Sequence, residues 1–142
     1  MRETIGILIV DNYCIVRHGL RYMLEQAEDM KVVGDCATSV EAFAKIASLR
    51  PHVVLVDAQM LRMNGVDATD SLVGNGAHCN YTVISLAKSV DHWIEAVETG
   101  TASYFLQDMT PEKLVETIRR VYHEMDDVPW IRLDEFTKKE TG

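Results

Sequence analysis

Long hydrophobic runs are absent from this sequence, whose uninterrupted apolar stretches reach no more than five residues. A helix needs about 18 consecutive apolar residues to cross a bilayer, so we expect no membrane-spanning segment. The first residues also lack the charged-then-apolar pattern of a secretory signal. We therefore expect a cytoplasmic protein that does not contact membranes.

Cysteine is scarce as well, because the chain has only Cys14, Cys36 and Cys79. Their odd number and wide spacing give neither a CxxC metal pair nor a disulfide framework, which favours a reducing cytoplasm. Cys14 falls at a predicted helix start beside acidic residues, and two interpretations are open for it, redox sensing and core packing. The five histidines show no metal-ligand spacing, and we expect them to face solvent.

Positive charge is in deficit, with 14 Lys and Arg residues against 22 Asp and Glu residues and a net charge of −8. Phosphate backbones bind to basic surfaces, so we do not expect this chain by itself to bind nucleic acid. The 142 residues are about the length of one domain. A content of 47% hydrophobic and 25% charged residues is typical of a globular domain.

What the sequence does contain is a regular alternation of short apolar runs and amphipathic segments. Continuous apolar runs predict buried strands, whereas apolar residues three and four apart predict helices. Five strand-then-helix units imply a doubly wound α/β fold with a parallel sheet, because parallel strands need crossover connections, which are right-handed. The predicted strands are at 7–10, 31–36 (near an edge), 53–57, 82–86 and 102–106.

Helix starts and buried helix faces follow from the same pattern. Thr38 and Glu41 form a capping-box pattern, and Thr110 followed by Pro111 predicts the start of the last helix. Residues 66–72 predict a further, weak helix. The apolar stripes expected to be buried are Ile15, Val16, Leu20, Met23 and Leu24; Val40, Phe43, Ala44 and Ala47; and Leu114, Val115, Ile118, Val121 and Tyr122. Another helix is marked by Val90, Trp93, Ile94 and Val97, and there we expect Trp93 to be exposed or half-buried.

Polar side chains stand at the ends of the predicted strands. The β-branched run at 53–56 predicts a strand that is buried on both faces, and it ends in the carboxylate of Asp57. Ligands collect at the carboxyl ends of parallel strands, so we expect Asp57 to lie at the centre of one crevice. The residues expected to converge on it are Asp11 and Asn12 after the first strand, Ser85 in the fourth, and Gln107 beyond the fifth.

Four segments together resemble the receiver domain of response regulators, of the CheY-like kind found in NarL/FixJ (LuxR-type) transcriptional regulators. They are 7–11, 15–20, 50–57 and 100–106, and the resemblance covers about residues 5–124. It implies a flavodoxin-like (βα)5 fold with strand order 2-1-3-4-5, and signalling through binding partners rather than enzymatic activity. Residues 126–142, polar and mixed in charge, are predicted to be a linker or tail after a domain at 1–125.

The resemblance gives each strand-end residue a role. Asp57 takes the position of the acceptor for a phosphoryl group from a histidine kinase, and Asp11 that of the first acid that binds Mg²⁺. The backbone carbonyl of Gln59 is implied as a further metal ligand, beside Asp57 itself. Ser85 takes the position of the hydroxyl that binds the phosphoryl group, and Tyr104 that of the aromatic residue that switches with it.

Three positions depart from the family pattern, with Asn12 for the second acid, Gln107 for the lysine and Leu61 for a proline. Three carboxylates with one lysine and two carboxylates with none both carry a formal charge of −2, so folding is not expected to suffer. Mg²⁺ prefers anionic oxygen ligands, and a phosphoryl group favours charged donors. We therefore expect weakened Mg²⁺ binding, and either weak phosphorylation or phosphorylation-independent regulation.

Several alternatives and partners remain open at this stage. A stand-alone pseudo-receiver that acts as a protein-interaction scaffold fits the same departures. A flavodoxin-type cofactor binder is disfavoured because residues 11–14 are not a Ser/Thr/Gly-rich phosphate loop, and an aspartyl-phosphate enzyme because the chain is short. We expect a homodimer through the first and last helices or through the fourth helix, fifth strand and last helix, with DNA bound only by a missing C-terminal helix-turn-helix domain.

Overall fold

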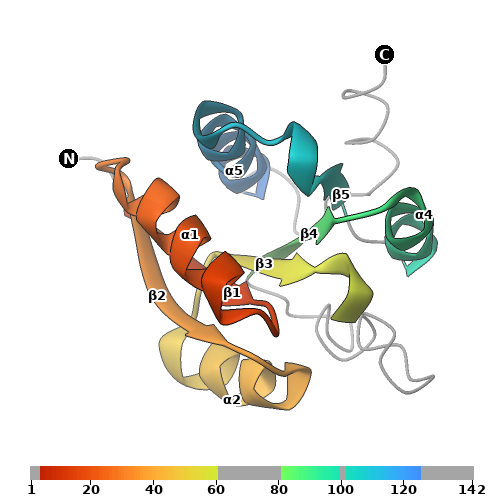
Figure 1. The fold of residues 1–142 in the computed structure, drawn as a ribbon. Helices are drawn as coiled ribbons and strands as arrows, with labels where there is room; N and C mark the ends of the chain where they lie inside the picture. Colours follow the sequence, from red (N-terminus) through yellow and green to blue (C-terminus); the bar gives the residue numbers. More distant parts are fainter. Residues whose placement is uncertain (1–3, 61–80, 100–101, 126–142) are drawn as a thin grey trace.

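The computed structural model describes residues 4–60, 81–99 and 102–125, and its strands form one parallel sheet (Figure 1). The strand order is β2-β1-β3-β4-β5, which confirms the predicted order and the edge position of β2. The strands are β1 (Ile5–Val10), β2 (Met30–Cys36), β3 (Val53–Asp57), β4 (Thr82–Ala87) and β5 (Ala102–Phe105).

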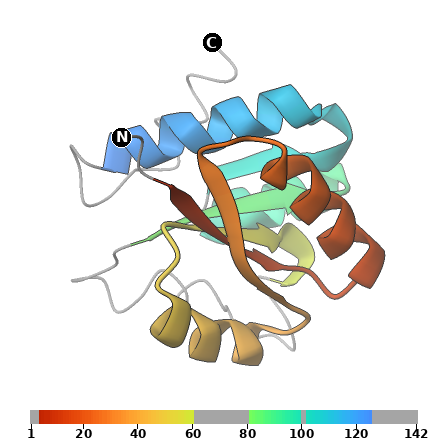
Figure 2. The same cartoon turned by 90° about the vertical axis from the view of Figure 1, so that its left-hand side faces the viewer.

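Helices cover both faces of the sheet, as the repeated strand–helix units predict (Figures 1 and 2). One apolar cluster joins the sheet to α1 and α5, and a second joins its other face to α2 and α4. The helices are α1 (Cys14–Glu25), α2 (Ser39–Leu49), α4 (Val90–Thr99) and α5 (Pro111–Met125), with a short 3-10 turn at Leu106–Asp108.

The two central strands β1 and β3 explain why the site forms where it does. Every residue of both strands is buried, because helices lie on each face and both runs are almost wholly aliphatic. Their register pairs Ile7 with Val53 and Val10 with Val56. The chain therefore reaches Asp11 and Asp57 at neighbouring points on the same edge of the sheet.

Local signals account for the helix starts. Thr38 is the N-cap of α2, where its side chain accepts a hydrogen bond of 3.2 Å from the backbone N–H of Glu41. The Thr110 hydroxyl accepts the N–H of Lys113 at 3.2 Å and caps α5. The stripe predicted for α5 is confirmed, because its members Leu114, Ile118, Val121 and Tyr122 are buried and Val115 packs against them.

The stripe predicted for α2 is wrong. Val40 is 76% exposed and Phe43 36% exposed, and Ala44 and Ala47 are also on the surface. The face that meets the sheet carries Ala42, which is fully buried, and the half-buried Ile46. The helix thus has two apolar stripes, and the sheet takes the one whose small Ala42 allows the closer approach.

One member of the stripe predicted for α1 also lies outside the core. Leu20 and Leu24 are buried, and Val16 and Met23 pack against the cluster, but Ile15 is 83% exposed. Other predictions concern residues outside the described ranges: Leu61, the weak helix at 66–72, Cys79 and the tail at 126–142.

His52 is half-buried at the start of β3 and does not simply face solvent. Its ring Nδ1 accepts a hydrogen bond of 2.8 Å from the backbone N–H of Gly6, and the backbone N–H of His52 donates to the Gly6 carbonyl at 2.8 Å. The ring meets Tyr122 edge-on at 5.1 Å between centroids. His52 therefore ties β1 to β3 and both strands to α5.

Replacement of His52 tests this tie. His52→Leu leaves the buried N–H of Gly6 without its acceptor, which we expect to lower the free energy of unfolding by about 1–3 kcal/mol. In His52→Asn, an amide oxygen replaces the ring nitrogen as acceptor, and the expected loss is smaller. Urea unfolding of both variants measures the difference, and equal losses would contradict a role for the hydrogen bond.

Candidate functional site

Asp57 closes β3 and is 2% exposed. Its two carboxylate oxygens have different partners. Oδ1 accepts the backbone N–H of Gln59 at 3.1 Å, and Oδ2 accepts a hydrogen bond of 3.1 Å from the ammonium of Lys88. The acid is thus held rigidly at the carboxyl end of the sheet.

Asp11 follows β1 and is 4% exposed. Its Oδ1 accepts the N–H of Tyr13 at 2.8 Å, and its Oδ2 lies 3.5 Å from the same Lys88 ammonium. Burial raises the pKa of Asp11, and the nearby charge of Asp57 adds to the rise, while the Tyr13 N–H and Lys88 oppose it. The two predicted acids are therefore together, as the parallel sheet requires.

Lys88 was not among the predicted site residues. It lies in the connection between β4 and α4, and its side chain is 27% exposed. The ammonium also sits 4.4 Å from the centroid of the Tyr13 ring, in the geometry of a cation–π contact. The two carboxylates and the Lys88 ammonium together carry a formal charge of −1, whereas the carboxylates alone carry −2. The available signal was its place three residues beyond Ser85, at the same edge of the sheet.

Ser85 and Tyr104 are both buried, on neighbouring strands. Ser85 pairs in register with Val56 of β3, one residue before Asp57, so it lies on the strand next to the one that ends in Asp57. Tyr104 is 6% exposed and packs in the cluster beneath α1 and α5, where its hydroxyl accepts a hydrogen bond of 3.2 Å from Arg120. Tyr104 thus occupies an inward position.

The remaining predicted residues are exposed. Asn12 and Gln107 are on the surface, and within the described ranges no hydrogen bond or ion pair joins either of them to Asp57. Gln59 is also exposed, and it contributes its backbone N–H to Asp57.

The donors suit a cation at one point of this site. Among the described residues there is no cluster of three or more His, Cys, Asp or Glu side chains that could hold a metal. The Oδ2 atoms of Asp11 and Asp57 nevertheless face the same place, and hard anionic oxygens are what Mg²⁺ prefers. These residues therefore fit Mg²⁺, at a position where the Lys88 ammonium already lies.

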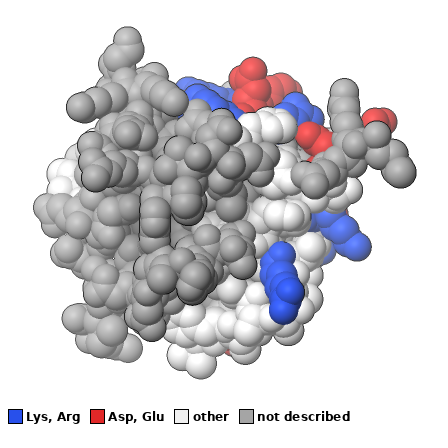
Figure 3. Space-filling view, turned by 180° about the vertical axis from the view of Figure 1, so that it is seen from behind, with Lys and Arg blue, Asp and Glu red and all other residues white. Residues whose placement is uncertain are grey.

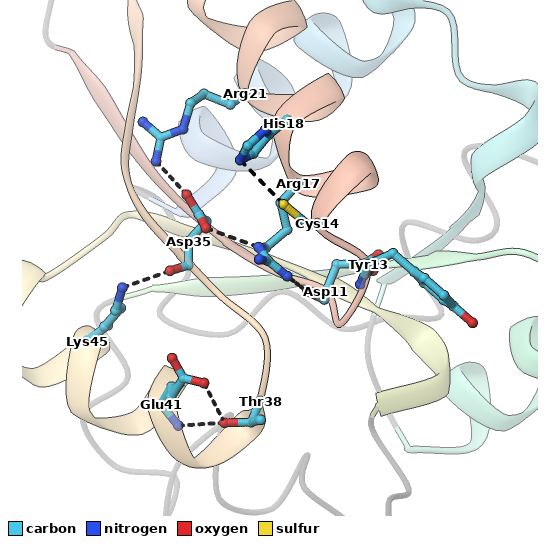
Figure 4. A network of polar contacts seen from close by, with 10 residues as sticks. All are labelled: Asp11, Tyr13, Cys14, Arg17, His18, Arg21, Asp35, Thr38, Glu41 and Lys45. Carbon is cyan, nitrogen blue, oxygen red and sulfur yellow. Dashed lines mark hydrogen bonds and ion pairs between the residues drawn. The ribbon is translucent and has the colours of Figure 1, made fainter.

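Arg17 connects this site to the edge strand β2 (Figure 4). Its guanidinium donates to the Asp11 carbonyl at 2.6 Å and to the Asp35 carboxylate at 3.0 Å. Arg21 donates to the other oxygen of Asp35 at 2.6 Å, and Lys45 of α2 donates to the Asp35 carbonyl at 2.7 Å. The hydrogen bond from Arg21, together with the positive charges of Arg21 and Arg17, lowers the pKa of Asp35.

Core packing is wrong as an interpretation of Cys14, which is exposed at the start of α1, with its sulfur 3.6 Å from Nε2 of His18. Cys36 is buried, and burial raises the pKa of its thiol to about 11, so it is not a reactive thiolate at neutral pH.

On the described part of the face in Figure 3, Lys and Arg side chains stand apart from one another and form no continuous basic surface. None of the described helices has the length and apolar character needed to cross a bilayer.

The Asp35 cluster predicts a pH-dependent stability. The pKa of Asp35 is lower in the folded state than its unfolded-state value of about 4. Asp35 therefore stabilises the fold fully above pH ~4, and this stabilisation is lost as pH falls through the folded-state pKa. Asp35→Asn should cost about 1 kcal/mol at pH 7 and progressively less below pH ~4. Chemical denaturation across pH measures this, with Glu28→Gln, an exposed acid, as the control. A loss that does not change with pH would contradict the ion pair.

The sequence is similar to those of known proteins. The family model of the response regulator receiver domain matches residues 7–119. The transcriptional regulatory protein YhcZ of Bacillus subtilis is 35% identical over 111 residues, which are 78% of this chain and 52% of that protein. BtsR of Salmonella typhi, also a transcriptional regulatory protein, is 32% identical over 120 residues, which are 84% of this chain and 49% of that protein. The chain thus spans about half the length of these relatives.

Solved structures share the fold. The response regulator domain of CheB from Thermotoga maritima is 25% identical, with a TM-score of 0.69, and the match covers 85% of this chain and 98% of that one. A DNA-binding response regulator of the LuxR family from Staphylococcus aureus is 24% identical, with a TM-score of 0.68, over 83% of this chain and 98% of that one. With its sheet order, its paired acids and the family match over residues 7–119, the chain belongs to the response regulator receiver domain family.

Proposed function

We propose that this chain is the receiver domain of a two-component response regulator that controls transcription, with Asp57 as the phosphoacceptor. The observation that carries the proposal is the buried Asp57 carboxylate at the end of β3, with Asp11 beside it and a lysine ammonium 3.1 Å from its Oδ2. A carboxylate that accepts a phosphoryl group needs positive charge close by, because the group brings about two negative charges. A histidine kinase is the proposed donor.

Mg²⁺ is the proposed cofactor, held by Asp11, Asp57, the backbone carbonyl of Gln59 and Asn12. When bound, it neutralises the charge of the transferred phosphoryl group. We expect its binding to be weaker than in a pocket with a second acid, because Asn12 offers a neutral oxygen. Gln107 can donate one neutral hydrogen bond but no charge, so phosphorylation and its readout through β5 are also expected to be weakened.

The readout is proposed to run through Ser85 and Tyr104. Ser85 would hydrogen-bond the phosphoryl oxygen, and Tyr104 would change its contacts with it. The buried Tyr104 hydroxyl at 3.2 Å from Arg120 of α5 links such a change to the last helix. That helix leads into residues 126–142, the proposed linker to a DNA-binding domain.

The whole protein is proposed to resemble its relatives in carrying a second domain. The chain spans 52% and 49% of the lengths of the two transcriptional regulatory proteins compared above. A C-terminal helix-turn-helix domain would supply the DNA contact, since this chain has a net charge of −8.

A second candidate is a pseudo-receiver that acts as a protein-interaction scaffold without phosphorylation. The ion pairs of Lys88 with Asp57 and Asp11 favour it, because they satisfy both acids within the chain itself. The two candidates differ in whether Asp57 reacts.

Phosphorylation separates these candidates. With Mg²⁺ and acetyl phosphate, we expect slow gain of one phosphoryl group by intact-mass spectrometry and none in Asp57→Asn. The paired reversion Asn12→Asp with Gln107→Lys should accelerate it about tenfold or more, since each change supplies a charged partner. With Mg²⁺ and beryllium fluoride, the backbone NMR signals of Asp57, Ser85 and Tyr104 should move. No shift at millimolar Mg²⁺ and no labelling would contradict an active receiver.

Self-association provides a further test. We expect a homodimer, through α1 and α5 or through α4, β5 and α5. Exposed apolar side chains on α1, Ile15 at 83% and Tyr22 at 71%, lie two helical turns apart, and α4 exposes Val90 at 61% and Ile94 at 43%. Light scattering of Ile15→Lys and Val90→Lys identifies the interface, because only the variant within it should dissociate. A monomer in the unmodified chain at high concentration would contradict the dimer.

A further inference from the structure

Asp11 and Asp57 use their oxygens in the same way. In each, Oδ1 accepts the backbone N–H of the residue two positions later, Tyr13 at 2.8 Å and Gln59 at 3.1 Å. In each, Oδ2 is turned toward the single ammonium of Lys88, at 3.5 Å and 3.1 Å. Two buried carboxylates from different strands thus present one oxygen each to a common position.

We propose that the Lys88 ammonium is the resident cation of this pocket and competes with Mg²⁺ for the position between Asp11 and Asp57. The inference rests on the proposed function for the identity of the metal site and adds what controls that site. Metal binding must then displace the ammonium from the two Oδ2 atoms, so Lys88 sets how much Mg²⁺ the pocket needs.

Burial of the two carboxylates strengthens their ion pairs with Lys88. The side chains of Asp57 and Asp11 are 0% and 5% exposed, and charges interact more strongly where water is excluded. Among the described residues, the two carboxylates would without Lys88 lie close together as like charges offset by one backbone N–H each, which is costly. The ammonium therefore stabilises the metal-free fold.

Tyr13 holds the same ammonium from another direction. Its ring centroid is 4.4 Å from Nζ, and the Tyr13 N–H also fixes Oδ1 of Asp11. One residue of the loop after β1 thus positions both the acid and the lysine that neutralises it. Tyr13 as a whole is 54% exposed, so its side chain can be replaced without opening the core.

Displacement is nevertheless feasible, because Lys88 belongs to the connection after β4 and its side chain is 27% exposed. At 3.5 Å, its contact with Asp11 is an ion pair at the limit of hydrogen-bond length. A divalent ion can replace it, but Mg²⁺ dehydrates reluctantly, and the neutral Asn12 gives it little help. The competition should favour lysine at low Mg²⁺.

The test compares the full chain with Lys88→Met, which keeps a long apolar side chain without charge. Lys113→Met is the matched control, because Lys113 is exposed at the start of α5. Magnesium affinity is measured by calorimetry, and thermal unfolding is followed with EDTA and with Mg²⁺. We expect Lys88→Met to bind Mg²⁺ about tenfold or more tightly. We also expect it to unfold about 5 °C lower in EDTA and to recover with Mg²⁺.

Tyr13→Ala supplies a milder variant, expected to raise Mg²⁺ affinity about two- to fivefold through loss of the cation–π contact. If Lys88→Met does not fold in EDTA, folding on addition of Mg²⁺ and the tighter binding of Tyr13→Ala both support the competition. Unchanged or weaker Mg²⁺ binding in Lys88→Met overturns the proposal, as does the absence of Mg²⁺ binding in every variant.

These outcomes are separate from the phosphorylation result. Tighter Mg²⁺ binding in Lys88→Met, with Asp57 unreactive toward acetyl phosphate, keeps the competition and removes the proposed phosphoacceptor role. Phosphorylation of Asp57 with equal Mg²⁺ affinity in Lys88→Met and the parent chain keeps the proposed function and removes the competition.

Discussion

The burial of two carboxylates at the ends of neighbouring strands is the constraint on which the site depends. Pairing of β1 with β3 is fixed by aliphatic side chains that the helices cover on both faces, and this pairing brings Asp11 and Asp57 together. Like charges in such a place require compensation. The fold provides it with one backbone N–H for each acid and one ammonium for both, so packing of the core and the chemistry of the pocket cannot be changed independently.

The sheet and the two acids could be predicted because their signals are local and repeated. Short β-branched runs identify central strands, and the parallel topology then places whatever follows them at one edge. Lys88 was missed because the resemblance placed a lysine only after the fifth strand, where this chain has Gln107. A long, flexible side chain in a neighbouring loop reaches the same point from another strand, and sequence spacing alone does not reveal its direction.

Helix faces were less predictable where a helix has more than one apolar stripe. In α2, the periodicity of Val40, Phe43, Ala44 and Ala47 is as regular as that of the buried face, so hydrophobicity does not choose between them. The face that allows the closer approach to the sheet is the one that is buried. It carries the small Ala42, and Gly34 of β2 leaves room for Leu49, because a Cβ at Gly34 would lie 2.8 Å from the Leu49 side chain. His52 was misjudged for a related reason, since an imidazole nitrogen can serve as an acceptor at the end of a sheet, where a backbone N–H lacks one.

Arg17 links the pocket at Asp11 and Asp57 to β2 at the edge of the sheet. One guanidinium contacts the Asp11 carbonyl and the Asp35 carboxylate, and Asp35 in turn receives Arg21 and Lys45 (Figure 4). Binding free energies at linked sites are reciprocal. If a protein docked on α1, β2 and α2 and moved Arg17 or Asp35, any change in cation affinity at Asp11 would be matched by an equal change, caused by the cation, in the affinity for that protein. The Arg17–Asp35 cluster and the pocket would then be coupled in both directions.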